Sequence, residues 1–147
     1  MGNNQGNFST IYNSAIRLLA IREHSKYELQ NKLFLKFKDS AAIQNLLTIL
    51  EEKDYQSQAR FLEVFVRSKV IKGYGPKKIT AELIIKHKIP KNLIVKEFQT
   101  QNLNWQNIAN QVLKKHLSRP ANKHKSRQQL IRFMLSRGFS TPNQLFS

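Results

Sequence analysis

Residues 73–89 read Gly-Tyr-Gly-Pro-Lys-Lys-Ile-Thr-Ala-Glu-Leu-Ile-Ile-Lys-His-Lys-Ile, and this stretch carries the signals of a short helix with a defined start. Pro76 suits the first helical position, because its missing N–H costs nothing there and its fixed φ is already helical. Two glycines ahead of it give the entering chain conformational freedom. Behind it, Ile79 and Leu83 repeat at helical spacing, and Ile84 widens the apolar stripe. We therefore predict a short, basic helix that begins at Pro76.

The same plan occurs before and after this stretch. Residues 22–33 read Arg-Glu-His-Ser-Lys-Tyr-Glu-Leu-Gln-Asn-Lys-Leu, and residues 125–139 read Lys-Ser-Arg-Gln-Gln-Leu-Ile-Arg-Phe-Met-Leu-Ser-Arg-Gly-Phe. If Leu33, Leu83 and Met134 are equivalent positions, the copies are 50 and 51 residues apart. Because identity between the copies is weak, we interpret them as repeats of structure more than of sequence.

In this order, the three stretches resemble a known family. The runs Arg-Glu-x-Ser-x-x-Glu-Leu-x-x-Lys-Leu, Gly-x-Gly-Pro-x-Lys-Ile-x-x-Glu-Leu and Arg-x-x-x-Arg-Gly-Phe are similar to those of RecX regulatory proteins, bacterial modulators of the RecA recombinase. The resemblance covers roughly residues 16–139. No single run is diagnostic, but the ordered set is specific.

The composition favours a helical protein. Hydrophobic residues make up 40% of the 147 residues, which is enough for real cores, and five Gly and four Pro are too few for a turn-rich β fold. No apolar run approaches the roughly 20 residues that cross a bilayer, and the N-terminus does not have the pattern of a signal peptide. With no cysteine, the chain is compatible with a reducing cytoplasm, where we expect it to reside.

We predict an all-α fold, built as an elongated array of three tandem three-helix repeats that resemble helix-turn-helix units. The last repeat is truncated, although Thr141-Pro142 could open one more helix. The predicted division is a disordered N-terminus at 1–7, repeat 1 at 8–54, repeat 2 at 55–102 and a shortened repeat 3 at 103–147.

Several helix ends are marked by capping residues. Ser9 or Thr10 can begin the first helix, Asp39 or Ser40 the third, and Asn104 the seventh. Ser25 and Glu28 form a capping-box pattern, in which the hydroxyl accepts the Glu28 N–H and the carboxylate reaches back to Ser25. Gly138 fits the left-handed residue that closes a helix. Helical spacing predicts these inward residues: Ile11, Ala15, Leu18, Leu19, Leu29, Leu33, Phe37, Ile43, Leu46, Leu47, Leu50, Leu93, Ile94, Phe98, Trp105, Ile108, Ala109, Val112, Leu130, Phe133 and Met134.

The chain departs from the family pattern at the start of the fourth helix. The family reads roughly Tyr-x-Asp-Asp-x-Arg-Phe-Ala here, whereas this chain has Ser57 and Gln58 at the two acidic positions and Leu62 for the alanine. Ser57 can still cap a helix, so the fold should survive, but ion pairs made by the missing acids are in doubt. The predicted inward face of this helix is Phe61, Val64, Phe65 and Ser68.

Charge points to an anionic partner. The chain has 25 Lys and Arg against nine Asp and Glu, a net charge of +16, and such an imbalance repels itself in the folded state. Nucleic acid is the first candidate partner, and an acidic protein or a membrane surface is the second. The densest basic stretch is 114–127, which contains no acid.

Residue patterns typical of catalysis are missing from the sequence. Glu51 and Glu52 point in different directions on a helix, and the four histidines are scattered without cysteines or paired acids, so we expect no enzyme, no metal site and no cofactor. The Gly-Tyr-Gly-Pro turn lacks the Gly-Lys-Ser/Thr of a P-loop, and we interpret it as a helix start. Trp105 could be a stacking platform for bases, but its apolar spacing favours a core position.

What the resemblance implies is a protein that binds in the groove of the RecA filament on single-stranded DNA. It would bridge RecA subunits, contact DNA and mainly inhibit ATP hydrolysis, strand exchange and coprotease activity in DNA repair, recombination and the SOS response. We expect a monomer that also binds duplex DNA weakly and does not bind membranes. From charge, the predicted contact residues are Lys77, Lys78, Lys86, Lys114, Lys115, Lys123, Lys125, Arg127, Arg132 and Arg137.

Two other functions remain open. One is a sequence-specific helix-turn-helix regulator of duplex DNA, since a three-helix unit can place a recognition helix in the major groove. The other is a basic helical protein associated with RNA or the ribosome. Charge alone supports only an anion-binding helical repeat.

Overall fold

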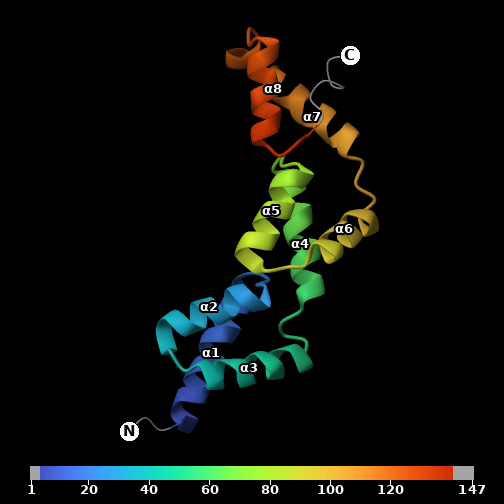
Figure 1. Ribbon diagram of the computed structural model, residues 1–147. Coiled ribbons are helices and arrows are strands. Elements are labelled where there is room, and N and C mark those ends of the chain that lie inside the picture. The colour runs from blue at the N-terminus through green and yellow to red at the C-terminus, as the bar shows by residue number, and fades with distance from the viewer. Residues whose placement is uncertain (1–3, 141–147) are drawn as a thin grey trace. The chain divides into compact units, whose positions relative to one another are not determined.

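The computed structural model describes residues 4–140, and within that range it is all-α, with no strand (Figure 1). The predicted all-α fold is confirmed, because every regular element among the described residues is a helix. The predicted opening of a further helix at 141–142 lies outside the described residues. The elements are α1 (Asn4–Ile21), α2 (Lys26–Phe37), α3 (Ser40–Glu52), α4 (Gln58–Ile71), α5 (Pro76–His87), α6 (Lys91–Thr100), α7 (Trp105–Ser118), the 3-10 helix η1 (Pro120–Asn122) and α8 (Arg127–Ser136).

The chain divides into two compact units. The first unit comprises residues 1–64 and 86–88, and the second comprises 65–85 and 89–147. Helices α4 and α5 therefore contribute residues to both units, and the finer division into repeats at 54/55 and 102/103 stays a prediction. Helix α1 begins at Asn4, inside the segment 1–7 for which we predicted disorder and ahead of the predicted start at Ser9 or Thr10. No helix among residues 4–140 has the length and apolar character to cross a membrane.

The core of the first unit comes from α1, α2 and α3. Its eight buried residues were all predicted from helical spacing, and each is at most 1% exposed. Leu18, Leu19 and Phe37 pack against this core from its edge, where each is half buried. The buried residues are Ile11, Ala15, Leu29, Leu33, Ile43, Leu46, Leu47 and Leu50.

Local caps start the helices of the first unit. The Ser25 hydroxyl accepts the Glu28 N–H at 3.1 Å, and the Asp39 carboxylate accepts the Ala42 N–H at 3.1 Å, as predicted. The prediction that the Glu28 carboxylate reaches back to Ser25 is wrong. The Glu28 carboxylate instead binds the Arg22 guanidinium through two bonds of 3.0 and 2.6 Å. A guanidinium group donates stronger, charge-assisted hydrogen bonds than a backbone N–H, so the carboxylate binds Arg22.

The predicted inward face of α4 is partly wrong. Phe61 is buried, but Val64 is 46% exposed, and Phe65 and Ser68 are only half buried. The other fully buried positions are instead Leu62 and Val66, which are 6% and 0% exposed. Because apolar residues occupy five of the six positions 61–66, the sequence pattern could not select one face of this helix.

The second unit buries the apolar stripe of α5 and a separate cluster on α7 and α8. Ile79, Leu83 and Ile94 are completely buried, whereas Ile84 and Leu93 are 38% and 43% exposed, against prediction. Trp105 is half buried, packs on the α7–α8 cluster and meets Phe98 edge to face, with ring centroids 5.0 Å apart, so it lies at the edge of the core it was predicted to join. The buried members of that cluster are Ala109, Leu113, Leu130, Met134 and Phe139.

The segment around Gly75 and the segment around Gly138 meet inside the second unit. The Gly75 N–H donates to the Arg137 carbonyl at 2.6 Å, and the Lys77 N–H donates to the Gly138 carbonyl at 3.0 Å. A Cβ on Gly75 would lie 2.7 Å from backbone atoms of Gly138, so no side chain fits there. Gly138 itself has φ +98°, the left-handed conformation predicted for it. The first turn of α5, whose N–H groups have no partner within the helix, is thus completed by the chain after α8.

Candidate functional site

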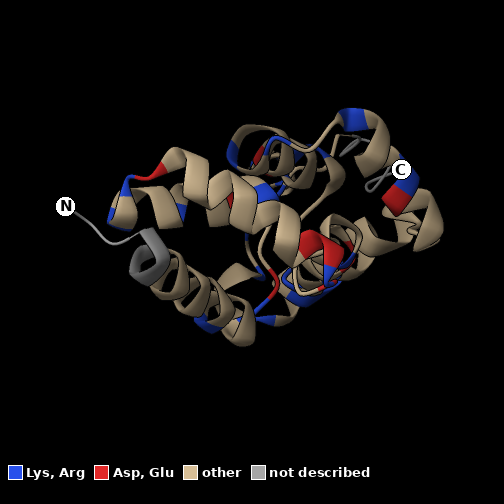
Figure 2. Ribbon diagram, turned by 90° about the horizontal axis from the view of Figure 1, so that it is seen from below, with Lys and Arg blue, Asp and Glu red and all other residues tan. Residues whose placement is uncertain are grey.

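The positive charge is concentrated in the second unit. Figure 2 shows Lys and Arg on many of the helices. The first unit has ten Lys and Arg against seven Asp and Glu, whereas the second unit has fifteen against two, and no acid follows Glu97. In the first unit, acids pair with cations, as in Arg60 with Glu23 at 2.8 Å and Lys26 with Glu51 at 2.8 Å. Two acids cannot neutralise fifteen cations, so the second unit presents a strongly positive surface.

Nine of the ten predicted contact residues belong to this basic unit, and Lys86 belongs to the first. Eight of the ten side chains are exposed, and Lys125 and Arg137 are half buried. Lys115 and Arg137 line one cavity, which is described next. Lys78 and Lys125 lie beside its residues, because Lys78 shares the Tyr74 ring with Arg137 and Lys125 contacts His116. The other five in this unit are spread along exposed faces of α5, α7, α8 and the segment between α7 and α8: Lys77, Lys114, Lys123, Arg127 and Arg132.

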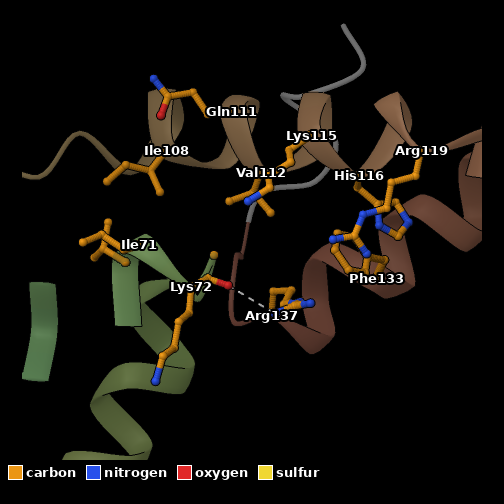
Figure 3. Close-up of a pocket in the computed structure, with 12 residues that line it drawn as sticks. Ile71, Lys72, Ile108, Gln111, Val112, Lys115, His116, Arg119, Phe133 and Arg137 are labelled. Atoms are coloured by element: carbon orange, nitrogen blue, oxygen red, sulfur yellow. Dashed lines mark hydrogen bonds between the residues drawn. The ribbon is translucent and has the colours of Figure 1, made fainter. Parts of the chain in front are cut away.

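The cavity lies among the C-terminal end of α4, the middle of α7 and the end of α8 (Figure 3). Its volume is about 360 Å³. One part of its wall is apolar, with Ile71 across from Ile108 and Val112. The charged part comes from Lys115, Arg119 and Arg137, together with His116, and no acid lines it. We call this site the basic cavity.

Arg137 is held in place at the basic cavity by aromatic faces. Its guanidinium carbon lies 5.1 Å from the centre of the Tyr74 ring and 5.2 Å from that of Phe133, and it donates to the Lys72 carbonyl at 3.4 Å. The Lys78 ammonium lies over the same Tyr74 ring at 4.9 Å. Such cation–π contacts orient a cation and leave its charge uncompensated. Arg137 therefore remains able to bind an anion.

His116 contributes a flat, uncharged ring to the cavity. It stacks on Phe133 with ring centroids 3.7 Å apart and an interplanar angle of 14°. Its Nε2 lies 3.3 Å from the Lys125 ammonium. Burial, and then the charges of Lys125, Arg119 and Arg137, lower the pKa of His116 below its ordinary value of 6.5. The ring is therefore neutral at pH 7, and the positive charge of the cavity comes from Lys and Arg.

Sequence reasoning found this cavity in part. Lys115 and Arg137 were predicted as contact residues, and the structure brings them together, but Ile71, Arg119 and His116 were missed. Arg119 and His116 stand in the acid-free stretch 114–127, so a prediction that took every cation and histidine there would have included them. No local signal marks Ile71, which becomes part of the site only through the packing of α4 near α7.

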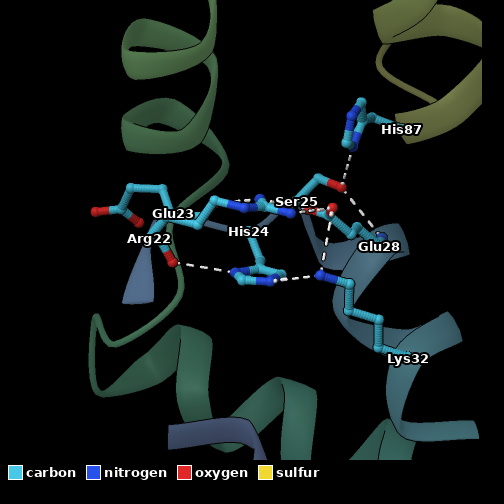
Figure 4. Close-up of polar contacts among 7 residues, drawn as sticks. All are labelled: Arg22, Glu23, His24, Ser25, Glu28, Lys32 and His87. Atoms are coloured by element: carbon cyan, nitrogen blue, oxygen red, sulfur yellow. Dashed lines mark hydrogen bonds and ion pairs between the residues drawn. The ribbon is translucent and has the colours of Figure 1, made fainter. Parts of the chain in front are cut away.

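A serine and a histidine also meet in the first unit, but their geometry is structural (Figure 4). Ser25 Oγ lies 2.7 Å from His87 Nδ1. The hydroxyl also accepts the Glu28 N–H, and Ser25 is 0% exposed. A nucleophile must reach its substrate, so this pair fastens α2 to the end of α5. Within residues 4–140, His, Asp and Glu form no group of three that could hold a metal ion.

Ser57 and Gln58, which stand where the resemblance led us to expect two acids, form hydrogen bonds within the first unit. Ser57 Oγ accepts the Arg60 N–H at 3.1 Å and caps α4, as predicted. Gln58 Oε1 accepts the Lys26 N–H at 2.9 Å. Arg60 forms ion pairs with Glu23 at 2.8 Å and Asp54 at 3.0 Å. Arg60 thus has two other acidic partners in this chain.

The fold and the charge together define a class: a helical-repeat protein with a basic surface suited to binding. Comparisons with known proteins define the family. The chain is 38% identical over 129 residues to the regulatory protein RecX of Legionella pneumophila, covering 87% of this chain and 85% of that protein. It is 34% identical over 131 residues to that of Haemophilus ducreyi, covering 88% and 85%. The chain therefore belongs to the RecX family of regulatory proteins.

A solved structure agrees with the helical fold. The crystal structure of RecX from Lactobacillus salivarius superimposes with a TM-score of 0.76 at 20% identity, covering 97% of this chain and 96% of that one. No family model matches the chain.

Proposed function

We propose that this protein binds the filament that RecA forms on single-stranded DNA and restrains RecA there. It lowers ATP hydrolysis, strand exchange and coprotease activity in repair and recombination. Membership of the RecX family supports a regulatory role. The observation that carries the DNA part of the proposal is the charge of the second unit, fifteen Lys and Arg against two acids.

A polyanion is the partner that such a surface suits. Exposed cations recur on α5, α7 and α8, so they can meet successive phosphates of a strand instead of a single small anion. Phosphate contacts of this kind give affinity that depends on salt and only weakly on sequence. We propose Lys77, Lys78, Lys86, Lys114, Lys115, Lys123, Lys125, Arg127, Arg132 and Arg137 as residues that contact the filament, with single-stranded DNA preferred over duplex and the protein acting as a monomer.

The test is RecA's ATP hydrolysis on single-stranded DNA while this protein is titrated in. We expect inhibition at amounts well below that of RecA, and we expect it to persist when single-stranded DNA is in excess. If the inhibition disappears with excess DNA, the protein only competes with RecA for DNA, and the proposed regulation of the filament would be wrong. A site-specific duplex complex that survives competitor DNA, or co-sedimentation with ribosomes without an effect on RecA, would favour one of the other two functions.

A further inference from the structure

We propose that the basic cavity binds a short acidic peptide segment of a protein partner, one that carries an aliphatic or aromatic side chain between its carboxylates. This goes beyond DNA binding. It rests on the proposed function only for the partner's identity, since the segment would then belong to the protein part of the filament. The ligand class follows from the two kinds of surface that the cavity combines.

The apolar part of the cavity favours a peptide over a nucleic-acid strand. Ile71 is 75% exposed, and Ile108 and Val112 lie half buried across from it (Figure 3). A single exposed isoleucine is ordinary, but one that shares a hollow with two other aliphatic residues offers a place for an apolar side chain. Bases stack on flat rings, but the two rings that line the cavity, His116 and Phe133, already stack on each other, and Arg137 lies over Phe133.

The charged part of the cavity favours acidic residues on both sides of that apolar residue in the bound segment. Lys115, Arg119 and Arg137 line it without any acid. Arginine forks bind carboxylates through two parallel hydrogen bonds, and Arg137 is already oriented by the Tyr74 and Phe133 rings. An acidic segment would also relieve the repulsion among these cations, which DNA elsewhere on the unit cannot do from a distance.

The size of the cavity sets the length of the segment. A volume of about 360 Å³ is at the small end of ligand pockets, enough for one large side chain and the adjoining backbone. We therefore expect recognition of a few residues in an extended or helical segment, not of a folded surface.

The test measures binding of two fluorescein-labelled probes by anisotropy: the peptide Glu-Asp-Leu-Phe-Asp-Glu and a single-stranded oligo-dT. No RecA is present, so the outcome is independent of the RecA ATPase test. The protein variants are Ile71→Ser and the double variant Lys115→Gln/Arg119→Gln. Their matched controls in the same unit are Ile85→Ser, at an isoleucine that is 67% exposed, and Lys91→Gln/Lys96→Gln at exposed lysines of α6.

We expect Ile71→Ser to weaken peptide binding about tenfold and to leave oligo-dT binding within about twofold, because only the peptide uses the apolar wall. The Lys115→Gln/Arg119→Gln variant should weaken peptide binding at least tenfold, against less than about threefold for its control. A second peptide, with serine in place of leucine and phenylalanine, should bind the unaltered protein about tenfold more weakly. This last measurement needs no protein variant, so it holds even if a variant folds poorly.

Three outcomes would overturn the inference. In the first, both peptides bind equally, which would mean general attraction between opposite charges. In the second, Ile71→Ser and Ile85→Ser have the same effect on peptide binding. In the third, Ile71→Ser weakens oligo-dT as much as peptide, which would assign the cavity to a nucleic-acid strand. None of these would contradict RecA regulation itself.

Discussion

At the scale of single residues, Gly75 has a different role from the one its sequence context indicates. We predicted conformational freedom before a helix, and Gly73, with φ +89°, has that role. Gly75 is required because of space, since a Cβ would lie 2.7 Å from the backbone of Gly138. The sequence cannot reveal such a contact, because the two glycines are far apart along the chain.

Replacement of Gly75 by alanine should therefore destabilise the protein. We expect the free energy of unfolding in urea to fall by about 1–3 kcal/mol, the usual cost of overpacking, because the neighbour of the new methyl group is backbone and cannot rotate away. Gly73→Asn should cost less, since asparagine tolerates positive φ and the nearest side-chain atom is 3.6 Å away. Equal losses at the two positions would contradict the close-approach explanation.

His24 should make the stability of the first unit depend on pH. The ring is buried, with Nδ1 3.0 Å from the Arg22 carbonyl and Nε2 3.0 Å from the Lys32 ammonium (Figure 4). Nδ1 is therefore assigned the proton, and Nε2 accepts from Lys32. Burial lowers the pKa of His24 below its ordinary value of 6.5, which the unfolded chain keeps. Between the two pKa values the unfolded state binds more protons, so protonation favours unfolding.

We therefore expect the free energy of unfolding to be highest above pH 6.5 and to fall as the pH drops below it toward the pKa of folded His24. Urea unfolding at pH 7.5, 6.5 and 5.5 measures this. Glu28, which faces the same cluster, has a lowered pKa, since its hydrogen bond and charge pairing with Arg22 outweigh burial, so it stays ionised over this range. His24→Gln should make the curve shallower and leave the part that His116, whose pKa is also lowered, contributes, while His124→Gln, at an exposed histidine, should not change it. A flat curve for the unaltered protein would contradict the assignment.

At the scale of the helix, signals that act over three or four residues were predictable. Ser25, Asp39, Ser57 and Asn104 each accept the N–H three residues on, as their spacing indicated. The errors arose where a distant or competing partner decides the outcome. Glu28 turned to Arg22, and α4 buries a face that tertiary packing selected from an almost continuously apolar stretch.

Helix α8 tests how much one cap contributes. Ser126 and Gln129 form a complete capping box, in which Ser126 Oγ accepts the Gln129 N–H at 3.2 Å and Gln129 Oε1 accepts the Ser126 N–H at 2.8 Å. We expect Ser126→Ala to lower the free energy of unfolding by about 0.5–2 kcal/mol. Ser136→Ala, near the other end of α8, should change it by less than about 0.5 kcal/mol, because this exposed hydroxyl only donates to a carbonyl of its own helix. Thermal or urea unfolding of both variants decides the point.

At the scale of the whole molecule, composition predicted a basic binding protein but not where the charge gathers. The count of +16 is shared unequally, because seven of the nine acids are in the first unit. Sequence reasoning pointed to the stretch 114–127 as the densest part, and the basic cavity includes its beginning. Its other walls come from α4 and α8, and only the fold could add them.

The charge of the second unit predicts how DNA binding depends on salt. The variant Lys123→Ala/Lys125→Ala/Arg127→Ala should weaken binding to oligo-dT and lower the slope of log affinity against log salt by about 2, if each cation meets one phosphate. The control Arg17→Ala/Lys36→Ala/Lys53→Ala removes the same charge from exposed positions of the first unit and should leave the slope nearly unchanged. Circular dichroism should report equal helicity. An unchanged slope in the first variant would remove this stretch from the interface.

The junction of Gly75 with Gly138 also bears on how the chain folds during synthesis. The amides of Gly75 and Lys77 emerge from the ribosome long before their acceptors, the carbonyls of Arg137 and Gly138, exist. At roughly 5–20 residues per second, the intervening stretch of roughly 60 residues takes roughly 3–12 s to make. Throughout that interval these two amides have only water for a partner. A nascent chain stalled before Arg137 should thus hold α5 with a frayed start, while the three-helix core of the first unit can already be closed.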